Sequence, residues 1–444
     1  MSTVRVAGIR QAADDCRTGV LIIGKSGSGK TNIVKKMVVD VLKIGDPLVA
    51  VDLADELTDF IRAKARAGLP VYRIDVHSRD GTGLDFAAIL TSETRRQEFV
   101  AKLCPEVPND PQPFFRSRAR DAMQSSLRIL DTTASRLWTL ADMIRLATNM
   151  DLHSAVAKEV PGCGGDPYRD IGASDSSRDV AGTVRSVLQP LAIYAALAEK
   201  APKSVSPTAV LDPNGGAMVL VWKDRYKTAM EAVFSFVLDV IAEEKLSQQS
   251  NQRLWVFGDE IRTLRPLESL PNIARRGRKS SICAVLTMHE IAGIRDRYGK
   301  DRAEELLALL DHKVFLRIGS PETARWASDY LGAVESLESV PPVDPSGKDT
   351  SVKRSVKERH NVRWDELRRV PMPDPRADRI EGYVDFPNFT AAFGCPFLAD
   401  VQGATPVLRQ TVPEEWEFLR GMTEADLSRL NLPNIKAVRE ALDS

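Results

Sequence analysis

The sequence predicts an α/β protein built on a mostly parallel, doubly wound sheet, with an inserted all-α domain and a small C-terminal extension. Short apolar runs alternate with helix-like stretches in the first hundred residues and again after residue 216, which is the pattern of βαβ units. From residue 114 onward apolar residues instead recur at helical spacing, without strand-like runs. At 444 residues, with 43% hydrophobic and 27% charged residues, the chain is long enough for two or three folded domains.

The first strand, turn and helix, over residues 19–40, carry the most informative motif. Gly24-x-x-x-x-Gly29-Lys30-Thr31 fits the P-loop pattern and stands between an apolar run and an amphipathic helix. Glycines let backbone N–H groups approach phosphate oxygens, Lys30 can reach the β and γ oxygens, and the Thr31 hydroxyl can ligate Mg²⁺. We therefore expect ATP and Mg²⁺ as cofactors. The expected nucleotide-binding residues are Gly24, Lys25, Ser26, Gly27, Ser28, Gly29, Lys30, Thr31 and Asn32.

The elements after residue 40 add strands to the sheet, and one all-helical insertion interrupts the alternation of strands and helices. The helical insertion runs from Phe114 to about Ala201, broken by a Gly-rich loop at 161–167, and a long helix is expected at about 226–248. After residue 345 the chain becomes charged and irregular, which indicates a linker or surface arm, and helical signals return near 414–419 and 423–442. We predict four regions: 1–113 and 207–345 as the two parts of an ATPase domain, 114–206 as the all-α insertion, and 346–444 as linker and C-terminal extension. Besides the run before Gly24, the candidate strands are Leu48–Asp52, Val71–Val76, Ala217–Trp222, Leu254–Phe257, Ile282–Thr287 and Lys313–Arg317.

A second acidic element is needed to hold the metal and prepare the attacking water. The apolar run Leu254–Phe257 is followed by Gly258, Asp259 and Glu260. Asp259 would hold Mg²⁺, together with Thr31, and Glu260 would orient or deprotonate the water. Lys30 and Asp259 are about 230 residues apart, more than a few βα units of roughly 30 residues each require. A sizeable insertion between them is therefore expected.

Composition limits the possible partners and compartments. Lys plus Arg is 61 and Asp plus Glu is 61, so any polyanion must be bound by a local basic patch. The five cysteines show no C-x-x-C pairing, which argues against a disulfide framework or a zinc site. Only 23 residues precede Gly24, without a signal-peptide core, and no later window approaches the roughly 18 apolar residues of a membrane span. We expect a cytoplasmic protein with no transmembrane segment of its own.

Among P-loop proteins, a ring motor fits best. The GTPase motif N-K-x-D and the LSGGQ-like signature of transporter subunits are absent, and a small-molecule kinase leaves the insertion without a role. Ring motors place an arginine at the γ-phosphate of a neighbouring subunit. The run Arg275-Arg276-Gly277-Arg278-Lys279 lies downstream of Glu260, and Thr287-Met288-His289 stands at the end of the next strand, where a phosphate sensor would lie. A solvated basic face remains the alternative for the arginines.

The order of motifs resembles the type IV secretion coupling proteins of the TraD/TrwB kind, conjugative DNA motors of the FtsK/HerA group. The resemblance covers roughly 19–332. It rests on DPQPFFRSRARDAMQSSLRIL, GDEIRTLRPLESLPNIARRGRKSSICAVLTMHEI, RDRYG and KVFLRIGSPETARWASDYLG.

The resemblance implies a RecA-like P-loop NTPase in which Gly24 to Thr31 is the Walker A loop and Asp259 and Glu260 are the Walker B pair. Lys30 and Glu260 would be catalytic, with Arg278 as the finger acting on a neighbouring subunit and His289 in the place of the family's sensor glutamine. The insertion would lie on the face of a homo-hexameric ring. Secretion-channel or relaxosome-type proteins would be partners, and one of them would hold the protein at the inner membrane.

Two groups of arginines are candidates for DNA binding. Arg116, Arg118 and Arg120 open the insertion, and Arg262, Arg265, Arg275 and Arg276 follow the acidic strand. Such side chains contact phosphates without reading bases, so we expect salt-sensitive, sequence-tolerant binding to DNA.

We therefore predict an ATP-hydrolysing DNA translocase, or coupling ATPase, that moves DNA or a nucleoprotein in conjugation or type IV secretion. Viral genome packaging by the same superfamily is a related alternative. An alternative of another class is a nucleotide-switched adaptor that recruits substrates to a secretion channel with little turnover. ATP hydrolysis measured with and without DNA separates the motor from the adaptor.

Overall fold

The computed structural model divides the chain into two compact units, each with its own strands and helices. Unit 1 comprises Met1–Asp46, Asn251–Arg262 and Leu270–Asp400, and unit 2 comprises Pro47–Ser250, Thr263–Ser269 and Val401–Ser444. The residues that the structure describes are 2–53, 55–169, 174–212, 216–248, 250–258, 260, 281–340, 353–374, 376, 378–398, 422–432, 435–436 and 438–439.

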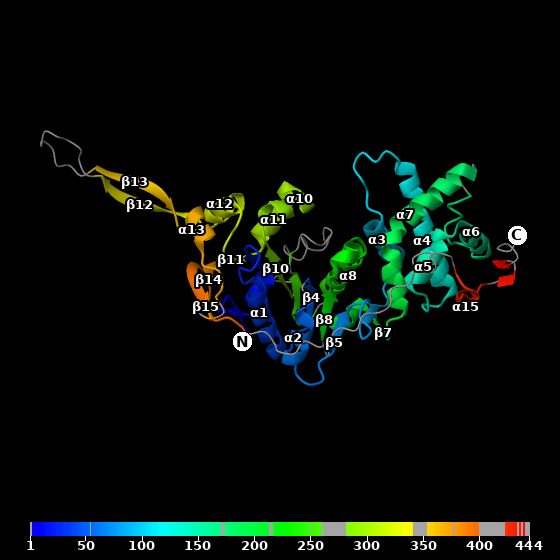
Figure 1. Ribbon diagram of the computed structural model, residues 1–444, viewed down its shortest axis with the longest axis horizontal. Helices are drawn as coiled ribbons and strands as arrows, with labels where there is room; N and C mark the ends of the chain where they lie inside the picture. Colours follow the sequence, from blue (N-terminus) through cyan, green and yellow to red (C-terminus); the bar gives the residue numbers. More distant parts are fainter. Residues whose placement is uncertain are drawn as a thin grey trace, which may run out of the picture. The chain divides into compact units, whose positions relative to one another are not determined.

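Unit 1 contains a mostly parallel run of strands (Figure 1). Its strands are β3 (Val20–Ile23), β9 (Leu254–Gly258), β10 (Ile282–Met288), β11 (His312–Phe315), β14 (Ile380–Phe386) and β15 (Phe389–Cys395). Their order is β15-β14-β11-β3-β10-β9. All residues of β3 and β10 are buried, as expected for central strands that are covered on both faces.

The strand register places the ends of these strands relative to one another. β3 pairs in parallel with β10 on one side and β11 on the other, and β9 pairs in parallel with β10. β14 runs antiparallel to β11, and β15 antiparallel to β14. One row of paired residues crosses four strands through Ile23, Phe315, Tyr383 and Ala392. The carboxyl ends of the parallel strands therefore share one edge, where open α/β sheets bind ligands.

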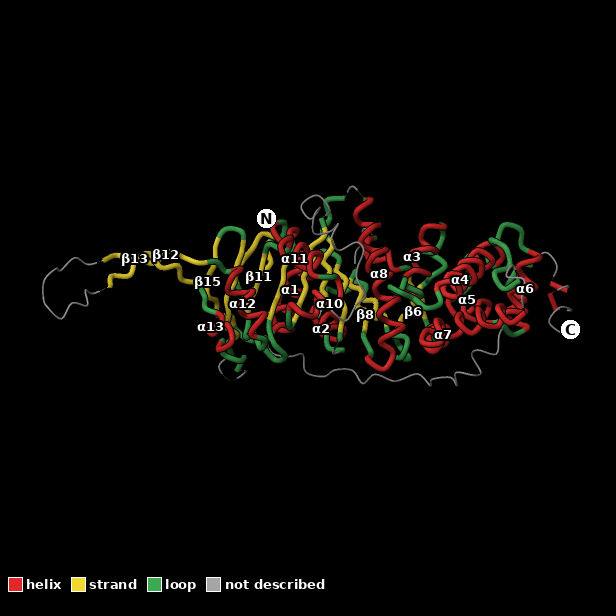
Figure 2. Tube along the Cα trace, turned by 90° about the horizontal axis from the view of Figure 1, so that it is seen from above, coloured by secondary structure: helices red, strands yellow, loops and turns green. Residues whose placement is uncertain are grey.

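The other elements of unit 1 precede, connect or follow these strands. They are β1 (Thr3–Val6), β2 (Ile9–Ala12), the 3₁₀ turn η1 (Asp15–Thr18), α1 (Lys30–Ile44), α10 (Ile291–Tyr298), α11 (Lys300–Leu309), α12 (Pro321–Tyr330), β12 (Ala333–Val340), β13 (Lys353–His360) and α13 (Trp364–Arg369). β12 and β13 form an antiparallel hairpin, and both views show them side by side (Figures 1 and 2).

Helix α1 follows the Gly-rich turn and buries one apolar stripe. Ile33, Met37 and Val41 recur at helical spacing and are buried. The helix ends at Gly45, whose φ of 84° is left-handed and whose N–H bonds back to Val41. The chain therefore leaves α1 at a residue without a side chain, as the left-handed conformation favours.

Unit 2 contains a second set of parallel strands and most of the helices. The elements are β4 (Leu48–Asp52), α2 (Leu57–Lys64), β5 (Val71–Ile74), β6 (Thr82–Leu84), α3 (Glu93–Leu103), α4 (Pro113–Thr133), α5 (Leu140–Thr148), α6 (Met150–Glu159), α7 (Ser174–Glu199), β7 (Lys203–Val205), η2 (Pro207–Leu211), β8 (Ala217–Val221), η3 (Asp224–Tyr226), α8 (Lys227–Ser247) and α15 (Glu424–Arg429). The strands run parallel in the order β4-β8-β5-β6-β7.

Helices α4, α5, α6 and α7 pack together without a strand among them (Figure 2). Their termini explain where they start: Pro113 stands in the first turn of α4, and Thr139 and Asp142 form a capping box at α5. Helix α15 joins this group through Arg429, whose guanidinium lies 2.9 Å from the Asp142 carboxylate. The all-helical insertion that the sequence predicts is thus present.

Helix α7 contains a segment that meets the length and composition of a membrane span. This segment, Ser176–Glu199, is the one such helix among the described residues, and 56% of its apolar window is buried inside the fold. It packs on α4 and α5. A buried core helix shares these properties, so the expectation that the chain has no transmembrane segment of its own stays a prediction.

The predicted α/β fold is confirmed, and each predicted strand is present as β3, β4, β5, β8, β9, β10 or β11. The sequence did not predict β14 and β15, nor the hairpin of β12 and β13, of which β13 lies in the region expected to be irregular. Along β14, buried residues alternate with half-buried ones, and such a strand lacks the continuous apolar signal of the central strands. Of the two helical signals in the tail, α15 lies inside the second, and 414–419 lies outside the described residues.

Candidate nucleotide site

The Gly-rich turn between β3 and α1 is held to two neighbouring strands. The Gly24 N–H donates to the carbonyl of Met288, the last residue of β10, at 3.2 Å. The Lys25 N–H donates to the carbonyl of Arg317, just after β11, at 2.8 Å. Backbone hydrogen bonds thus fix the start of the turn at the carboxyl edge of the strands.

Glycine is required at three positions of this turn. Gly27 and Gly29 have φ values of 73° and 98°, in the left-handed region that side chains disfavour. A Cβ on Gly24 would lie 2.4 Å from Ser28 Oγ and 2.9 Å from Leu316 Cβ, closer than atoms can approach. The glycines of the motif therefore stand where the backbone is left-handed or where no Cβ fits.

The turn contains polar groups suited to an anion. Ser28 is 2% exposed, and its hydroxyl has no hydrogen-bond partner among the described residues. The Lys30 ammonium donates to the carbonyls of Gly24 at 2.7 Å and Lys25 at 3.2 Å. A phosphate oxygen would give the buried hydroxyl a hydrogen-bond partner. It would also replace the neutral carbonyls around the Lys30 ammonium with a charged acceptor, which forms a stronger hydrogen bond. The residues present therefore fit a nucleotide phosphate chain.

His289 lies between Lys30 and Glu260. Its Nδ1 is 3.2 Å from the Lys30 ammonium, and its Nε2 is 2.8 Å from Glu260 Oε2. Because an ammonium only donates hydrogen bonds, Nδ1 must be the acceptor. In the neutral ring the proton then lies on Nε2, the atom that faces the carboxylate. The structure thus brings together three residues that the sequence predicted to be catalytic.

The backbone of Glu260 is fixed from the next strand. Its N–H donates to the Thr287 hydroxyl at 3.0 Å, and its φ of 53° is left-handed. The residue is only 6% exposed. A non-glycine residue held in this conformation is strained, a feature that clusters at functional sites.

Several predicted residues cannot be placed. Those outside the described residues are Asp259, Arg278, Arg262, Arg265, Arg275 and Arg276. Their predicted roles in metal binding, catalysis and DNA binding stay predictions.

Asn32 has a different neighbour from the one that the sequence suggested. Its side-chain amide donates to the Leu398 carbonyl at 2.8 Å, and its oxygen accepts from the Leu398 N–H at 3.0 Å. Asn32 therefore holds the chain after β15 against the start of α1. The other polar residues of the motif are half-buried or exposed: these are Lys25, Ser26 and Thr31. No local signal in the sequence could have paired residues 366 positions apart.

The arginines of α4 are engaged within unit 2. They are half-buried, and an arginine held by a protein partner is less available to a phosphate. Arg116 pairs with Asp110 at 2.6 Å, Arg118 with Asp121 at 3.5 Å, and Arg120 donates to the Cys104 carbonyl at 2.8 Å and reaches Glu106 at 3.5 Å.

A segment far along the chain covers the glycines of the turn. A Cβ on Gly27 would lie 3.3 Å from Met372 Cε, and one on Gly29 would lie 3.1 Å from Pro373 Cγ and 3.2 Å from Ile380. Sequence reasoning missed these neighbours because residues 371–380 carry no motif.

The topology and the site together define a P-loop nucleotide-binding protein. The Gly-rich turn follows β3, His289 follows the adjacent β10, and Glu260 follows β9 beyond it. The three groups thus converge at the carboxyl edge of neighbouring parallel strands.

Comparison with known proteins gives the family. Residues 3–391 match the family described as the type IV secretion-system coupling protein DNA-binding domain, so the chain belongs to this family. The coupling protein TraD of Escherichia coli (strain K12) is 26% identical over 130 residues, which are 28% of this chain and only 18% of TraD.

Solved structures share the fold. The unbound form of the bacterial conjugative coupling protein TrwBdeltaN70 superimposes with a TM-score of 0.70 and 21% identity, covering 90% of this chain and 88% of that chain. TrwB in complex with ADP and Mg²⁺ gives a TM-score of 0.69 at 21% identity, with 91% of both chains covered.

Proposed function

We propose that this protein is an ATPase that uses Mg²⁺-ATP hydrolysis to move DNA, or DNA with bound protein, through a conjugation or type IV secretion apparatus. The observation that carries the proposal is the chain of contacts from Lys30 through His289 to Glu260. A P-loop lysine that can bind phosphate oxygens and a buried carboxylate that can accept a proton from water are groups that phosphoryl transfer to water uses.

The polar groups of the turn have defined tasks in this proposal. Lys30 exchanges the Gly24 and Lys25 carbonyls for phosphate oxygens, and the Ser28 hydroxyl, which has no hydrogen-bond partner among the described residues, gains one. The backbone N–H groups around Gly27 and Gly29 add donors at the start of α1. When bound, Mg²⁺ neutralises the charge that develops on the phosphates. Thr31 and Asp259 would hold it.

Glu260 and His289 divide the work on the attacking water. Glu260 accepts the proton of the attacking water. Because Glu260 is buried, bulk solvent does not compete with this water for the carboxylate. His289 Nε2 lies 2.8 Å from Glu260 Oε2, and His289 Nδ1 accepts from the Lys30 ammonium. A change at the phosphates that moves Lys30 would therefore also move His289, which lies next to the Glu260 carboxylate.

The proposal extends to DNA and to assembly. Membership of a DNA-binding coupling protein family supports a nucleic-acid substrate. We propose that Arg262, Arg265, Arg275 and Arg276 contact its phosphates in the channel of a homo-hexamer, and that Arg278 of one subunit stabilises charge at the site of its neighbour. Because Arg116, Arg118 and Arg120 have carboxylate or carbonyl partners, they would contact DNA only after exchanging them.

Phosphate release measured with and without DNA tests the function. We expect turnover that needs Mg²⁺, rises on adding single- or double-stranded DNA, and is lost in Lys30→Ala and Glu260→Gln. Turnover that persists in either variant would refute the site. Tight ATP binding with no DNA-stimulated turnover would instead favour the recruitment adaptor.

A further inference from the structure

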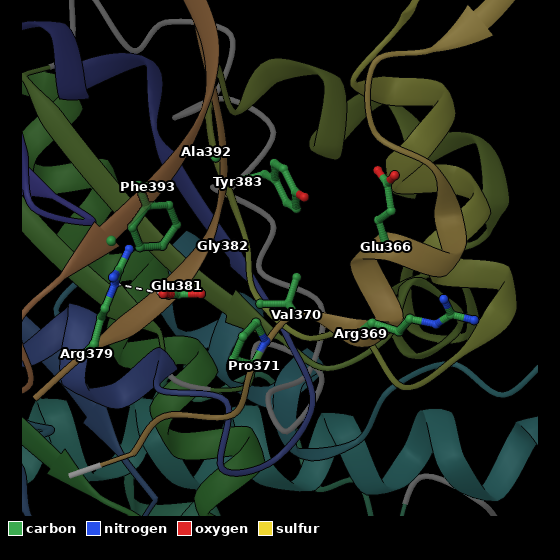
Figure 3. A pocket seen from close by; sticks show the side chains of 11 residues that line it. Glu366, Arg369, Val370, Pro371, Arg379, Glu381, Gly382, Tyr383, Ala392 and Phe393 are labelled. Carbon is green, nitrogen blue, oxygen red and sulfur yellow. Dashed lines mark ion pairs between the residues drawn. The ribbon is translucent and has the colours of Figure 1, made fainter. Parts of the chain in front are cut away.

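One cavity of unit 1 lies between α13 and the strands β14 and β15, and the charges of its lining balance (Figure 3). Its volume is about 430 Å³. Two arginines and two glutamates line it, and two of these residues, Arg379 and Glu381, form an ion pair at 2.7 Å. Such a lining gives no reason to expect a charged ligand.

A second cavity of unit 1, of about 370 Å³, lies at the opposite edge of the strands from the Gly-rich turn. It is lined by residues of β2 and η1, by Asp311 and His312 at the start of β11, and by residues 386–389, where β14 turns into β15. The start of β11 pairs with the start of β3, whereas the Gly-rich turn follows the end of β3. The cavity is therefore separate from the nucleotide site, and its size falls in the range of small-molecule sites.

The carboxylates of this second cavity outnumber its cations. Asp14 is compensated, since it pairs with Arg17 at 2.7 Å and with Arg253 at 3.0 Å. Asp15 and Asp311 also line the cavity, and neither carboxylate has an ion-pair partner among the described residues. Two negative charges are thus left for a ligand, and a molecule with two positive charges would complement them.

Thr18 connects the two uncompensated residues. The Asp311 N–H donates to the Thr18 carbonyl at 3.3 Å, and the Thr18 hydroxyl donates to the Asp15 carbonyl at 3.1 Å. Asp15 and Asp311 are therefore neighbours in the fold, although they lie far apart in the sequence. A small ligand in the cavity can be reached by both side chains.

His312 adds a hydrogen-bond acceptor to the same cavity. Its side chain is fully buried, and its Nε2 has no hydrogen-bond partner among the residues that the structure describes. Burial lowers its pKa, so the ring is neutral and one nitrogen is an acceptor. The Thr18 hydroxyl lies 3.5 Å from Nδ1 and already donates elsewhere, so Nδ1 carries the proton and Nε2 accepts. A buried acceptor without a donor is costly, and an ammonium group, which only donates, would satisfy it.

The rest of the wall is apolar. The Phe386 ring lies 5.2 Å from the His312 ring and 5.4 Å from the Phe389 ring, measured between centroids. Pro387 lines the cavity beside them, and Phe389 is 42% exposed. Methylene groups gain by contact with such a wall, and the face of an aromatic ring attracts an ammonium group. Acidic groups beside an apolar wall thus match a short methylene chain that carries an ammonium group at each end.

A divalent metal ion would suit this cavity less well. Its oxygen ligands must converge within about 2–2.6 Å of one point. Among the described residues, no group of three or more His, Cys, Asp or Glu side chains is placed to do so. The aromatic wall would also supply no ligand to a metal.

We propose that this cavity binds an aliphatic diamine, whose ammonium groups are held by Asp15, Asp311 and His312 and whose methylene groups lie against Phe386 and Phe389. The inference is independent of the proposed function, because the cavity shares no residue with the nucleotide site.

Titration calorimetry of the full chain at low salt, with putrescine (1,4-diaminobutane) and with n-butylamine, tests the inference. Butylamine has the same four carbons but one ammonium group, so the ratio of the two affinities isolates the second charge. Asp15→Asn and Asp311→Asn each remove one carboxylate charge at nearly constant side-chain size. Asp296→Asn removes an exposed carboxylate of α10, outside the cavity, and is the matched control. Thermal unfolding shows that each variant is folded.

We expect the wild type to bind putrescine about tenfold or more tightly than butylamine, the scale of one charge-assisted hydrogen bond. Asp15→Asn and Asp311→Asn should each reduce this preference, and the double variant should abolish it, whereas Asp296→Asn should keep it. Binding of neither amine, no preference in the wild type, or a preference that survives in the double variant would overturn the inference. Displacement of putrescine by Mg²⁺ at the same concentration would assign the cavity to a metal ion and overturn it as well.

Discussion

The contact between His289 and Glu260 makes a quantitative prediction for a double-variant cycle. Removing a general base costs about 10²–10⁴-fold in rate, and we take about 10³ for Glu260→Gln. Removing one group that positions a reacting carboxylate costs about 10², the expectation for His289→Ala. Independent effects would multiply to about 10⁵. Because the two side chains are 2.8 Å apart and act as one unit, we expect the double variant to lose only about 10³.

The difference of about 10² corresponds to about 2.7 kcal/mol of coupling. The assay is phosphate release at saturating Mg²⁺-ATP and DNA. A loss of about 10³ remains measurable at high enzyme concentration, whereas a loss of about 10⁵ does not. His360→Ala is the matched control, since this histidine is exposed on β13 and outside the site. Full activity in His289→Ala, or multiplicative losses in the double variant, would refute the reasoning.

Three further predictions concern the turn, the insertion and the chain after β15. Gly29→Ala should lose nucleotide affinity in titration calorimetry and about 1–3 kcal/mol of stability. Gly68 is also left-handed but has open space around it, so Gly68→Ala should lose stability only. Equal nucleotide affinity in the two variants would contradict this prediction. His153 is fully buried, and burial lowers its pKa to about 4 from 6.5, so the unfolded chain binds a proton between these values that the folded chain does not. His153 should therefore contribute about 3 kcal/mol to the loss of stability as the pH drops from 6.5 to 4. Burial also lowers the pKa of His77 to about 4, so His153→Leu should reduce the slope in urea titrations followed by circular dichroism without abolishing it. An unchanged slope would rule out His153 as a source of the pH dependence. Asn32→Ala removes both hydrogen bonds to Leu398, so amide exchange at Leu398 should accelerate at least about tenfold in hydrogen-exchange mass spectrometry, and unchanged exchange would show that the segment is held elsewhere.

The sequence was most informative where local rules act. Gly27 and Gly29 stand where the backbone is left-handed, and Gly24 stands where no Cβ fits. Such requirements depend on a few consecutive residues and leave a readable pattern. The continuous apolar runs of β3 and β10 were equally readable because central parallel strands are buried on both faces.

The sequence was least informative after residue 345. β14 and β15 have exposed or half-buried residues at alternate positions, a weaker signal than that of the central strands. β14 lies next to β11 through antiparallel pairing between segments about 70 residues apart, which no local pattern encodes, and β15 pairs with β14. The contacts of Pro373 and Ile380 with Gly29 depend on that pairing.

By itself, then, the sequence determined the phosphate-binding turn, the acidic strand, the helical insertion and the family resemblance. These features arise from backbone conformation and from the periodicity of burial, which neighbouring residues specify. Only the tertiary structure decided that His289 lies between Lys30 and Glu260, that Asn32 holds Leu398, and that Met372, Pro373 and Ile380 border the turn. Contacts of this kind depend on which strands become neighbours, and the free energy that selects those neighbours is spread over the whole core.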